Sequence, residues 1–462
     1  MLVNTLLKDI ITKEFAWHYR VIPFENTEKT IGFYSDYAFD KSEDVFLEEL
    51  EVVFGKEIKI QKKESAEIEK ALTLNYRLTE TKQDFNDSFL DSIIKEAIEL
   101  GSSDIHCEIY EADARIRLRI DGVLVEKRKI EKEEYQEIVN RIKIQSNLEI
   151  TEKRLPQDGR TRINNFDIRV SILPTHFGEK IVMRILGQDT SNIEIDNLGL
   201  ESKEKAHYLE AVKKSNGIIL ISGPTGSGKT TTLYATLKMI NTVEKNILTV
   251  EDPVEYTLKG VNQVQLNDKI GLSFSSTLRS FLRQDPDIIM LGEIRDKETA
   301  EMAIRASLTG HLVMSTVHTN SAWGTVSRLI DMGVPSYLLA ETLNVTVAQR
   351  LVRKLCGTCK KKTEIVAGNF PDTFEPPREI NYHYEAVGCE HCYYTGYKGR
   401  RAIYEIIPID QILSKEIRNN GQDIRDVLKQ KKIETLSDKA FNLFEAGETS
   451  LSEVYSIFIN NN

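Results

Sequence analysis

The chain has 462 residues, of which 40% are hydrophobic and 29% are charged, and its formal net charge is −10. This length is too great for one compact core and predicts about three domains, while the acidic balance argues against a general nucleic-acid or anionic-membrane surface. No apolar run approaches the ~20 residues needed to cross a bilayer, and charged residues interrupt residues 1–20, so we expect a cytoplasmic protein without a transmembrane segment or secretory signal.

Residues 1–80 form a small unit without chemical motifs, and we expect a docking module. The stretch at residues 15–24 is typical of a helix end that runs into a strand. We interpret His18 as a structural or surface histidine rather than a metal ligand, because no second ligand lies near it in the sequence. Residues 56–70 are charged and helical in character, which suits a linker.

A second, mixed α+β unit is expected over residues 85–186. It opens with an amphipathic helix over residues 84–100, whose apolar side chains recur at helical spacing. Residues 115–120 alternate arginine with apolar residues, which predicts a half-buried strand with a basic outer face. The Asp121-Gly122 pair that follows predicts a type I′ hairpin turn.

The rest of this unit is expected to contain a helix and two strands, at residues 135–148, 166–173 and 180–186. The two strands carry Arg169 and Arg184, each set singly among apolar neighbours. Arginines on strands are usually solvated, but this unit directly precedes a glycine-rich motif, and arginines of an adjacent domain can neutralise phosphate charge. Residues 187–197 lack periodicity and are predicted to be a linker.

The clearest motif of the chain lies in residues 217–233. A branched apolar run has the composition of a buried parallel strand, and it leads into a segment that fits G-x-x-x-x-G-K-[ST] at every position. Such glycines let backbone N–H groups surround β- and γ-phosphates, Lys229 adds a positive charge, and the Thr230 hydroxyl is placed to ligate Mg²⁺. The predicted nucleotide-binding residues are Gly223, Pro224, Thr225, Gly226, Ser227, Gly228, Lys229, Thr230 and Thr231.

Three further apolar runs follow at βαβ spacing, at residues 247–250, 288–291 and 312–317, and each ends in polar residues. Ligands of an open parallel sheet bind at the carboxyl ends of its strands, so these polar residues are candidates for Mg²⁺ and water chemistry. We favour Glu293 as the acid that acts on the attacking water, with Glu251 orienting that water, although the sequence does not divide these roles. His318 is a candidate sensor of the γ-phosphate, and a buried, hydrogen-bonded histidine is the alternative.

Four of the five cysteines form two C-x-x-C pairs separated by 29 residues. This spacing in a cytoplasmic chain predicts a zinc site with four cysteine ligands, within an insertion over residues 354–400. Disulfides are the alternative, and catalytic zinc is disfavoured because four thiolates close the coordination shell. The predicted ligands are Cys356, Cys359, Cys389 and Cys392, and the unpaired Cys107 is expected to pack.

Together these motifs resemble those of the type II secretion and type IV pilus assembly ATPases. The matching stretches are Ser103-Asp-Ile-His106, residues 154–160, residues 178–184, the glycine-rich motif, residues 249–256, 282–287, 292–296 and 310–320, the cysteine pairs, and residues 399–405. They occur in the family's order over about residues 85–462. Cys107 stands where the family usually has an aromatic residue, and the short N-terminal unit leaves the docking partner open.

The resemblance implies an α/β fold in which a RecA-like P-loop domain with a parallel-sheet core, residues 198–462, follows a PAS-like α+β domain. It names an Asp box at residues 251–255, a Walker B motif at residues 288–293 and a His box at residues 311–318. It also implies that Arg169 and Arg184 reach the nucleotide when the second domain closes over the P-loop domain. The implied cofactors are ATP, Mg²⁺ and Zn²⁺.

The function implied by the resemblance is that of a hexameric ATPase that powers pseudopilus or pilus assembly through an inner-membrane platform protein. A further docking protein would bind the N-terminal unit, and the chain would be peripheral at the inner membrane through these partners. Arginine contacts made only on closure would favour ATP over ADP, so hydrolysis would bias the hinge at residues 187–197 towards opening. A retraction motor, a DNA-uptake motor and a nucleotide-dependent scaffold are the alternatives, although retraction members generally lack the cysteine insertion.

Overall fold

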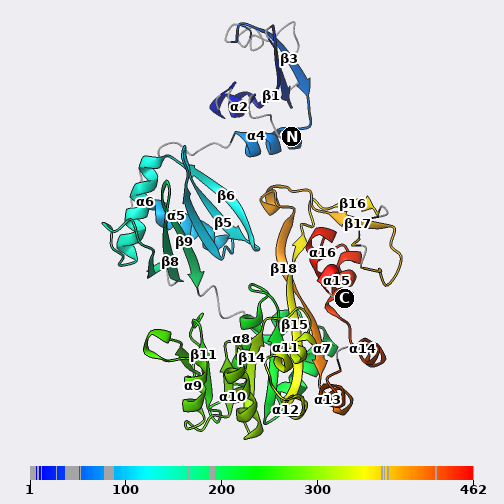
Figure 1. Cartoon of the computed structure of the whole chain (residues 1–462). Coiled ribbons are helices and arrows are strands. Elements are labelled where there is room, and N and C mark those ends of the chain that lie inside the picture. The colour runs from blue at the N-terminus through cyan, green and yellow to red at the C-terminus, as the bar shows by residue number, and fades with distance from the viewer. Residues whose placement is uncertain are drawn as a thin grey trace. The chain divides into compact units, whose positions relative to one another are not determined.

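The computed structural model describes Leu7 and residues 10–460, except for residues 12, 28, 37–50, 52–53, 77–87, 164–165, 187–192, 366–367, 369, 372–373 and 422–423. The chain forms two compact units, Met1–Ser92 and Ile93–Asn462 (Figure 1). The predicted end of the N-terminal unit, at residue 80, lies outside the described residues. The division between the units falls within helix α5 (Ser88–Glu99).

In the described residues of the N-terminal unit, two helices pack with a three-stranded sheet. Its elements are α2 (Lys13–Tyr19), β1 (Val21–Asn26), β2 (Thr30–Ser35), β3 (Glu57–Lys62) and α4 (Ser65–Asn75), with strand order β1-β2-β3. The predicted helix-to-strand passage at residues 15–24 is confirmed. The interpretation of residues 56–70 as helical is right for residues 65–70, which begin α4, but wrong for residues 57–62, which form β3. Alternation of charged residues with Ile58 and Ile60 makes β3 a strand, whose Ile58 is buried in the core. The side chain of His18 lies outside the described residues.

The second part of the chain contains a six-stranded antiparallel sheet in the order β6-β5-β4-β9-β8-β7. Its elements after α5 are β4 (Asp104–Ile109), β5 (Ala114–Ile120), β6 (Val123–Ile130), α6 (Lys132–Gln145), β7 (Gln157–Ile163), β8 (Phe166–Thr175) and β9 (Gly178–Leu186). The predicted hairpin is confirmed, since Asp121 and Gly122 have φ values of 49° and 85° as a type I′ turn requires. Strands β4 and β7 are not evident in the sequence, because β4 carries Asp104, His106 and Glu108 and β7 is a polar edge strand.

The third part of the chain is built on a seven-stranded sheet in the order β12-β11-β13-β14-β10-β15-β18. All neighbours are parallel except β15 and β18, which are antiparallel. The strands are β10 (Gly217–Ser222), β11 (Ile247–Glu251), β12 (Asn262–Gln265), β13 (Ile288–Leu291), β14 (Leu312–Val317), β15 (Leu343–Leu355) and β18 (Tyr397–Pro408). The predicted α/β fold with a parallel core is therefore confirmed. Four of its strands, β10, β11, β13 and β14, are found where the apolar runs predicted them, whereas β12, β15 and β18 were not predicted.

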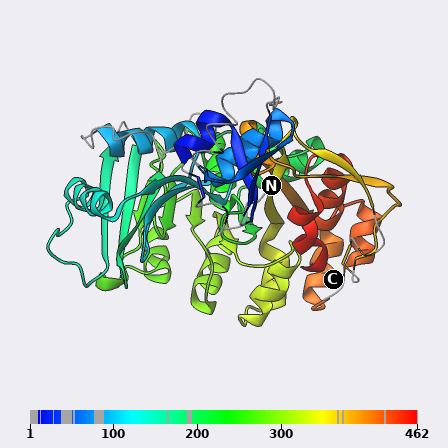
Figure 2. The same cartoon turned by 90° about the horizontal axis from the view of Figure 1, so that it is seen from above.

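Helices flank this sheet along the chain. They are α7 (Ser202–Val212), α8 (Lys229–Ile240), α9 (Phe274–Phe281), α10 (Lys297–Leu308), α11 (Gly324–Asp331), α12 (Ser336–Thr342), α13 (Gln411–Arg418), α14 (Arg425–Lys431), α15 (Leu436–Glu445) and α16 (Leu451–Asn460). Figure 2 shows α15 and α16, in red, side by side, as does Figure 1. None of the described helices combines the length and the apolar character needed to cross a membrane.

Strand β10 is buried on both faces and joins two apolar clusters. Ile218 and Leu220 belong to the cluster that includes α10 and α15, whereas Ile219 and Ile221 belong to the cluster that includes α7 and α8. Alternating side chains of one strand point to opposite faces, and burial of each contributes about 1.5–3 kcal/mol. The strand that leads into the glycine-rich loop is therefore firmly fixed.

Two shorter segments complete this part of the chain. The 3-10 helix Ile195–Leu198 contributes the buried Ile195 to the cluster of α7 and α8, so the end of the predicted linker packs on this sheet. The preceding residues 187–192 lie outside the described ones. Between β15 and β18, the insertion contains β16 (Lys361–Glu364), β17 (Tyr382–Glu385) and the 3-10 turn Glu390–Cys392.

Candidate functional site

The loop between β10 and α8 takes a conformation that requires glycine. Gly223, Gly226 and Gly228 have φ values of 149°, 80° and 88°. A Cβ atom on Gly223 would lie 2.5 Å from the backbone oxygen of Gln349 and 2.6 Å from Oγ of Ser227. That Oγ is itself buried and has no hydrogen-bond partner among the described residues. The backbone can thus approach a ligand closely here, at the N-terminus of α8, where free N–H groups favour an anion.

Lys229 supplies the positive charge of this loop. Its Nζ donates hydrogen bonds to the backbone oxygens of Gly223, at 2.8 Å, and Pro224, at 3.0 Å. Burial lowers the pKa of Lys229, the negative charge of Glu293 opposes this effect, and the positive charge of Arg350 adds to it. Thr230 and Thr231, on the first turn of α8, are both exposed to solvent. The loop is therefore cationic and accessible at the helix start.

Glu293 and His318 lie together at the carboxyl edge of the parallel sheet. Glu293 follows β13, its side chain is 16% exposed, and its Oε2 lies 3.5 Å from Nε2 of His318. Its Oε1 accepts a hydrogen bond from Nη2 of Arg295, which also lies 3.8 Å from a carboxylate oxygen of Asp252. The His318 side chain is 53% exposed, so the alternative of a buried histidine is wrong. Because Glu293 also acts electrostatically on Lys229, we call Lys229, Glu293 and His318 the Lys229 cluster.

Glu251 is placed differently from the other predicted acid. It is 3% exposed at the end of β11, where its carboxylate accepts hydrogen bonds from the hydroxyl of Tyr234, from Oγ1 of Thr249 at 2.6 Å and from Nε2 of Gln263 at 3.2 Å. Tyr234 lies on α8, so Glu251 joins that helix to the sheet. Among the described contacts of Glu251, none is with the Lys229 cluster.

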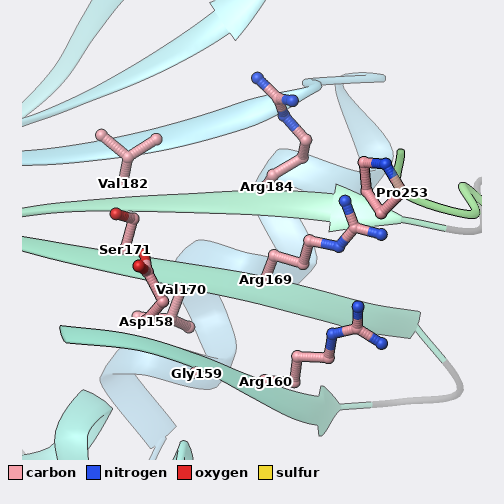
Figure 3. A pocket seen from close by; sticks show the side chains of 9 residues that line it. All are labelled: Asp158, Gly159, Arg160, Arg169, Val170, Ser171, Val182, Arg184 and Pro253. Carbon is pink, nitrogen blue, oxygen red and sulfur yellow. The ribbon is translucent and has the colours of Figure 1, made fainter. Parts of the chain in front are cut away.

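The predicted arginines line a second concave surface, a pocket of about 520 Å³. Arg169 on β8 pairs directly with Arg184 on β9 and with Arg160 on β7, so three arginines form one row across three strands. Figure 3 shows the side chains of Arg160 and Arg169 extending in the same direction, while the guanidinium of Arg184 turns away from theirs; Pro253 lies beside the row. Nη2 of Arg169 donates a hydrogen bond of 2.8 Å to the backbone oxygen of Val254. The arginine row thus lies against the loop that follows Glu251.

The arginines of the row repel one another. Burial lowers the pKa of Arg169, the carboxylate of Glu255 opposes that shift, and the charges of Arg160 and Arg184 lower the pKa further. Like charges so arranged favour the binding of an anion between them. Sequence reasoning found Arg169 and Arg184 but assigned no role to Arg160, which only the pairing of β7 aligns with them. No contact between this row and the Lys229 cluster is found among the described residues.

The four predicted zinc ligands form one cluster. Their sulfur atoms all lie within 4.8 Å of one another, and three pairs, Cys356–Cys389, Cys359–Cys392 and Cys389–Cys392, are 3.8 Å apart. A tetrahedron with Zn–S bonds of about 2.3 Å has sulfur–sulfur edges of about 3.8 Å, whereas a disulfide bond is about 2.05 Å long. All are free thiols, so the disulfide alternative is wrong and the cluster fits zinc. Cys107 is likewise free and buried, as predicted, and burial raises its pKa to about 12.

Backbone N–H groups point at these sulfurs as well. Sγ of Cys359 accepts from the N–H of Gly388 at 3.3 Å, and Sγ of Cys392 accepts from the N–H groups of Cys389 and Gly396 at 3.1 and 3.2 Å. Such bonds favour the thiolate form that a metal requires. The pairs lie at the end of β15 and just before β18, so the cluster closes the insertion at its base.

Comparison with known proteins identifies the family. Residues 79–456 match the model of the type II/IV secretion system protein family. The chain is 48% identical over 374 residues to the type IV pilus assembly ATPase PilB of Myxococcus xanthus, covering 78% of this chain and 66% of that relative. It is 44% identical over 380 residues to the putative type II secretion system protein E of Escherichia coli, covering 80% of this chain and 76% of that relative. The chain therefore spans slightly less than two thirds of the length of the first relative.

Solved structures agree with this assignment. The pilus retraction motor PilT with bound ADP is 29% identical, with a TM-score of 0.56, and the match covers 80% of this chain and 96% of that one. The Legionella pneumophila ATPase DotB, at 22% identity and a TM-score of 0.61 over 84% of this chain and 99% of that one, shares the fold. The names of these relatives and neighbours support the prediction of an ATP hydrolase. The chain belongs to the type II/IV secretion system protein family.

Proposed function

We propose that this chain hydrolyses MgATP to power assembly of a type IV pilus or of a type II secretion pseudopilus. The observation that carries the proposal is the Lys229 cluster, in which the Glu293 carboxylate pairs with the His318 imidazole and acts electrostatically on the Lys229 ammonium of the glycine-rich loop, at the carboxyl edge of a parallel sheet. The family membership and the named ATPases among the relatives support it.

In this proposal the phosphates of ATP lie on the glycine-rich loop. Lys229 exchanges its backbone oxygen partners for phosphate oxygens, and the N–H groups at the start of α8 bind the same anion. Thr230 holds the Mg²⁺ ion, which when bound neutralises phosphate charge. Glu293 polarises the attacking water and His318 senses the γ-phosphate. Glu251, which is held by its hydrogen bond from Tyr234 of α8, orients the attacking water.

Arg169 and Arg184 are proposed to bind the terminal phosphate when the arginine-bearing domain closes over the P-loop domain. An anion bound between these like charges would relieve their repulsion, which gives a closed state a preference for ATP over ADP. Loss of the γ-phosphate then biases a hinge at residues 187–197 towards opening. A scaffold that binds nucleotide without turnover would not need this set of groups.

We assign the four-cysteine cluster to one structural zinc ion. Cys356, Cys359, Cys389 and Cys392 supply four thiolates, so no coordination position remains for a substrate. The ion would hold the insertion at residues 354–400 together. We retain the remaining predicted units, namely a docking domain at residues 1–80, a PAS-like domain at residues 85–186 and a RecA-like domain at residues 198–462.

The proposed working form is a homohexamer, peripheral at the inner membrane through a platform protein and a docking protein that binds the N-terminal unit. The test is steady-state phosphate release as a function of protein concentration, with the molar mass of each sample determined by light scattering. Activity that rises steeply as a species of about six chains appears supports catalysis completed by assembly. Full activity in a pure monomer would refute the proposal that a hexamer is the working form. A hexamer that binds nucleotide without releasing phosphate would refute the proposed ATPase function.

A further inference from the structure

Asp104 is a buried carboxylate on β4 that the proposed mechanism does not use. It is 5% exposed and belongs to the Ser-Asp-Ile-His stretch of the sequence. Its Oδ1 accepts a hydrogen bond of 2.9 Å from Nε of Arg184, and its Oδ2 accepts one of 2.8 Å from Oγ of Ser103. Oδ2 also lies 3.6 Å from Nε of Arg119. One oxygen of the carboxylate is thus committed to Arg184 while the other is held by the two neighbours.

The backbone fixes the same pair. Asp104 and Arg184 are register partners on the adjacent strands β4 and β9, and Arg184 is in turn the partner of Arg169 on β8. The carboxylate therefore lies at the end of the arginine row, next to the member whose side chain is 59% exposed. Its position is determined by strand pairing and not by a mobile loop.

The guanidinium of Arg184 has two distinct edges. Its Nε bonds to Asp104, and no partner of its two Nη atoms is found among the described residues. Both Nη atoms can therefore donate to one anion in the fork geometry that suits phosphate oxygens. Arg184 is also one of the residues that line the pocket shared with Arg169 and Arg160.

Asp104 also opposes two tendencies that would draw Arg184 out of the row. An exposed arginine has many rotamers, and holding one of them requires a fixed partner. The charges of Arg169 and Arg160 repel Arg184, whereas the buried carboxylate attracts it through a charge-assisted hydrogen bond. The row stays aligned because one of its ends carries a negative charge.

The other titratable groups of β4 do not compete for Arg184. Glu108 is engaged by three cationic side chains, with distances of 2.8–3.1 Å to Arg115, Arg117 and Lys180. His106 is buried, and burial lowers its pKa, with the charge of Arg119 adding to this effect, so it stays neutral near pH 7. The pairing of Asp104 with Arg184 is therefore specific on this strand.

We propose that Asp104 is a positioning residue that holds Arg184 by its Nε so that the two Nη atoms are aimed, before nucleotide arrives, at the terminal phosphate of ATP. The inference rests on the proposed function and adds to it a residue that does not itself contact the nucleotide. Misplacement of a phosphate-binding group by about 1 Å can cost roughly a hundredfold in rate. Loss of Asp104 should consequently weaken catalysis through Arg184 and through no other group.

The test is a double-variant cycle in the full chain, with steady-state phosphate release giving kcat and KM. We expect Asp104→Ala to lower kcat/KM by about 10- to 100-fold. Asp104→Asn should retain part of this activity, because its amide oxygen still accepts from Nε but carries no charge. In the Arg184→Ala background, both Asp104 substitutions should change kcat/KM by less than about twofold, because no guanidinium remains to be positioned.

Glu108→Gln is the matched control, since it removes a buried carboxylate with more cationic partners from the same strand. It should leave kcat and KM within about twofold of the parent values, even where it lowers thermal stability. The inference is overturned if the kcat/KM of Asp104→Ala equals or exceeds that of the parent protein. It is also overturned if Asp104→Ala lowers kcat/KM by the same factor in the parent and in the Arg184→Ala background. Should Asp104→Ala fail to fold by circular dichroism, the Asp104→Asn cycle decides in the same way.

The outcome is separable from that of the proposed function. If the parent protein binds a fluorescent ATP analogue but does not hydrolyse ATP, the proposed motor function is refuted. The positioning of Arg184 by Asp104 can then still be tested by measuring the affinity for the analogue. The dissociation constant for the analogue should then rise in Asp104→Asn when Arg184 is present and stay constant when Arg184 is alanine. Equal shifts in both backgrounds overturn the positioning role.

Discussion

Replacing Glu293 by glutamine removes one negative charge from the Lys229 cluster and keeps the size of the side chain. The amide oxygen can still accept the hydrogen bond from Arg295, so the local structure should persist. The amide cannot take a proton from water, and its NH₂ group, where it faces Nε2 of His318, cannot accept from that nitrogen. The substitution thus isolates the chemical role of the carboxylate from its structural role.

The expected loss of turnover is large while nucleotide binding is retained. A positioned general base contributes about 10²- to 10⁴-fold, which corresponds to about 3–5 kcal/mol in the activation free energy. Binding should stay equal or become tighter, because the carboxylate that repels the γ-phosphate is gone while Lys229 and Arg295 remain. The assay is steady-state phosphate release by Glu293→Gln and the parent protein, with affinity measured by titration of a fluorescent ATP analogue.

The matched control for this prediction is Glu298→Gln. Glu298 lies in the first turn of α10 and forms an exposed ion pair with Arg279, so its loss should change kcat by less than about twofold. Equal phosphate release by Glu293→Gln and the parent would remove Glu293 from the mechanism. Loss of ATP binding together with turnover would refute the reasoning in a different way, by showing that the carboxylate holds the loop rather than the water.

Three other predictions concern the metal, the pH dependence and the loop. Elemental analysis should find about one zinc per chain in the parent protein and in the control variant Cys107→Ala. Cys389→Ser should contain little zinc and should melt at a lower temperature than the parent. An absence of zinc from freshly reduced parent protein would contradict the zinc site. Burial raises the pKa of Glu108, but its cationic partners outweigh burial and lower this pKa from 4.5 to about 2. After allowance for screening by solvent, the Glu108 carboxylate should stabilise the fold by about 2–3 kcal/mol. This stabilisation should be present above about pH 4.5 and should be lost as the pH falls towards 2. The difference in melting temperature between the parent and Glu108→Gln should shrink accordingly, and a constant difference between about pH 7 and pH 3 would contradict this account. Gly223→Ala should weaken binding of the fluorescent ATP analogue more than about tenfold because its Cβ would meet a backbone oxygen at 2.5 Å, whereas Gly199→Ala, with φ of 81° and nothing within 4 Å, should bind normally.

Much of the fold is readable from the chain because its signals are local. The branched apolar run before the glycine-rich loop predicts β10, and the Asp121-Gly122 pair predicts the hairpin that the φ values confirm. The two C-x-x-C pairs predict a cluster that the sulfur distances bear out. The prediction for β3 is wrong because its charged residues suggest a solvated helix, whereas the alternating Ile58 and Ile60 determine its period.

By itself the sequence determined those parts of the site whose chemistry resides in one contiguous stretch. The curl of the loop around Lys229 depends on glycines within a few residues of it, and such backbone requirements are visible in the sequence. Glu293 and His318 were identified because each follows an apolar run that ends at the same edge of the sheet. The conformation of such a motif is determined by residues close to one another in the sequence, so it can be predicted from the sequence alone.

Only the tertiary structure decided the pairings that join distant strands. Asp104 and Arg184 are 80 residues apart, and neither segment of the sequence predicts that β4 and β9 are neighbouring strands. The register of β7 brings Arg160 into line with Arg169, and the packing of α8 gives Glu251 a tyrosine partner that leaves it buried. The physical reason is that a one-residue shift in strand register moves every side chain to the opposite face, so such contacts are specified by the packing of the whole sheet and not by any one of its strands.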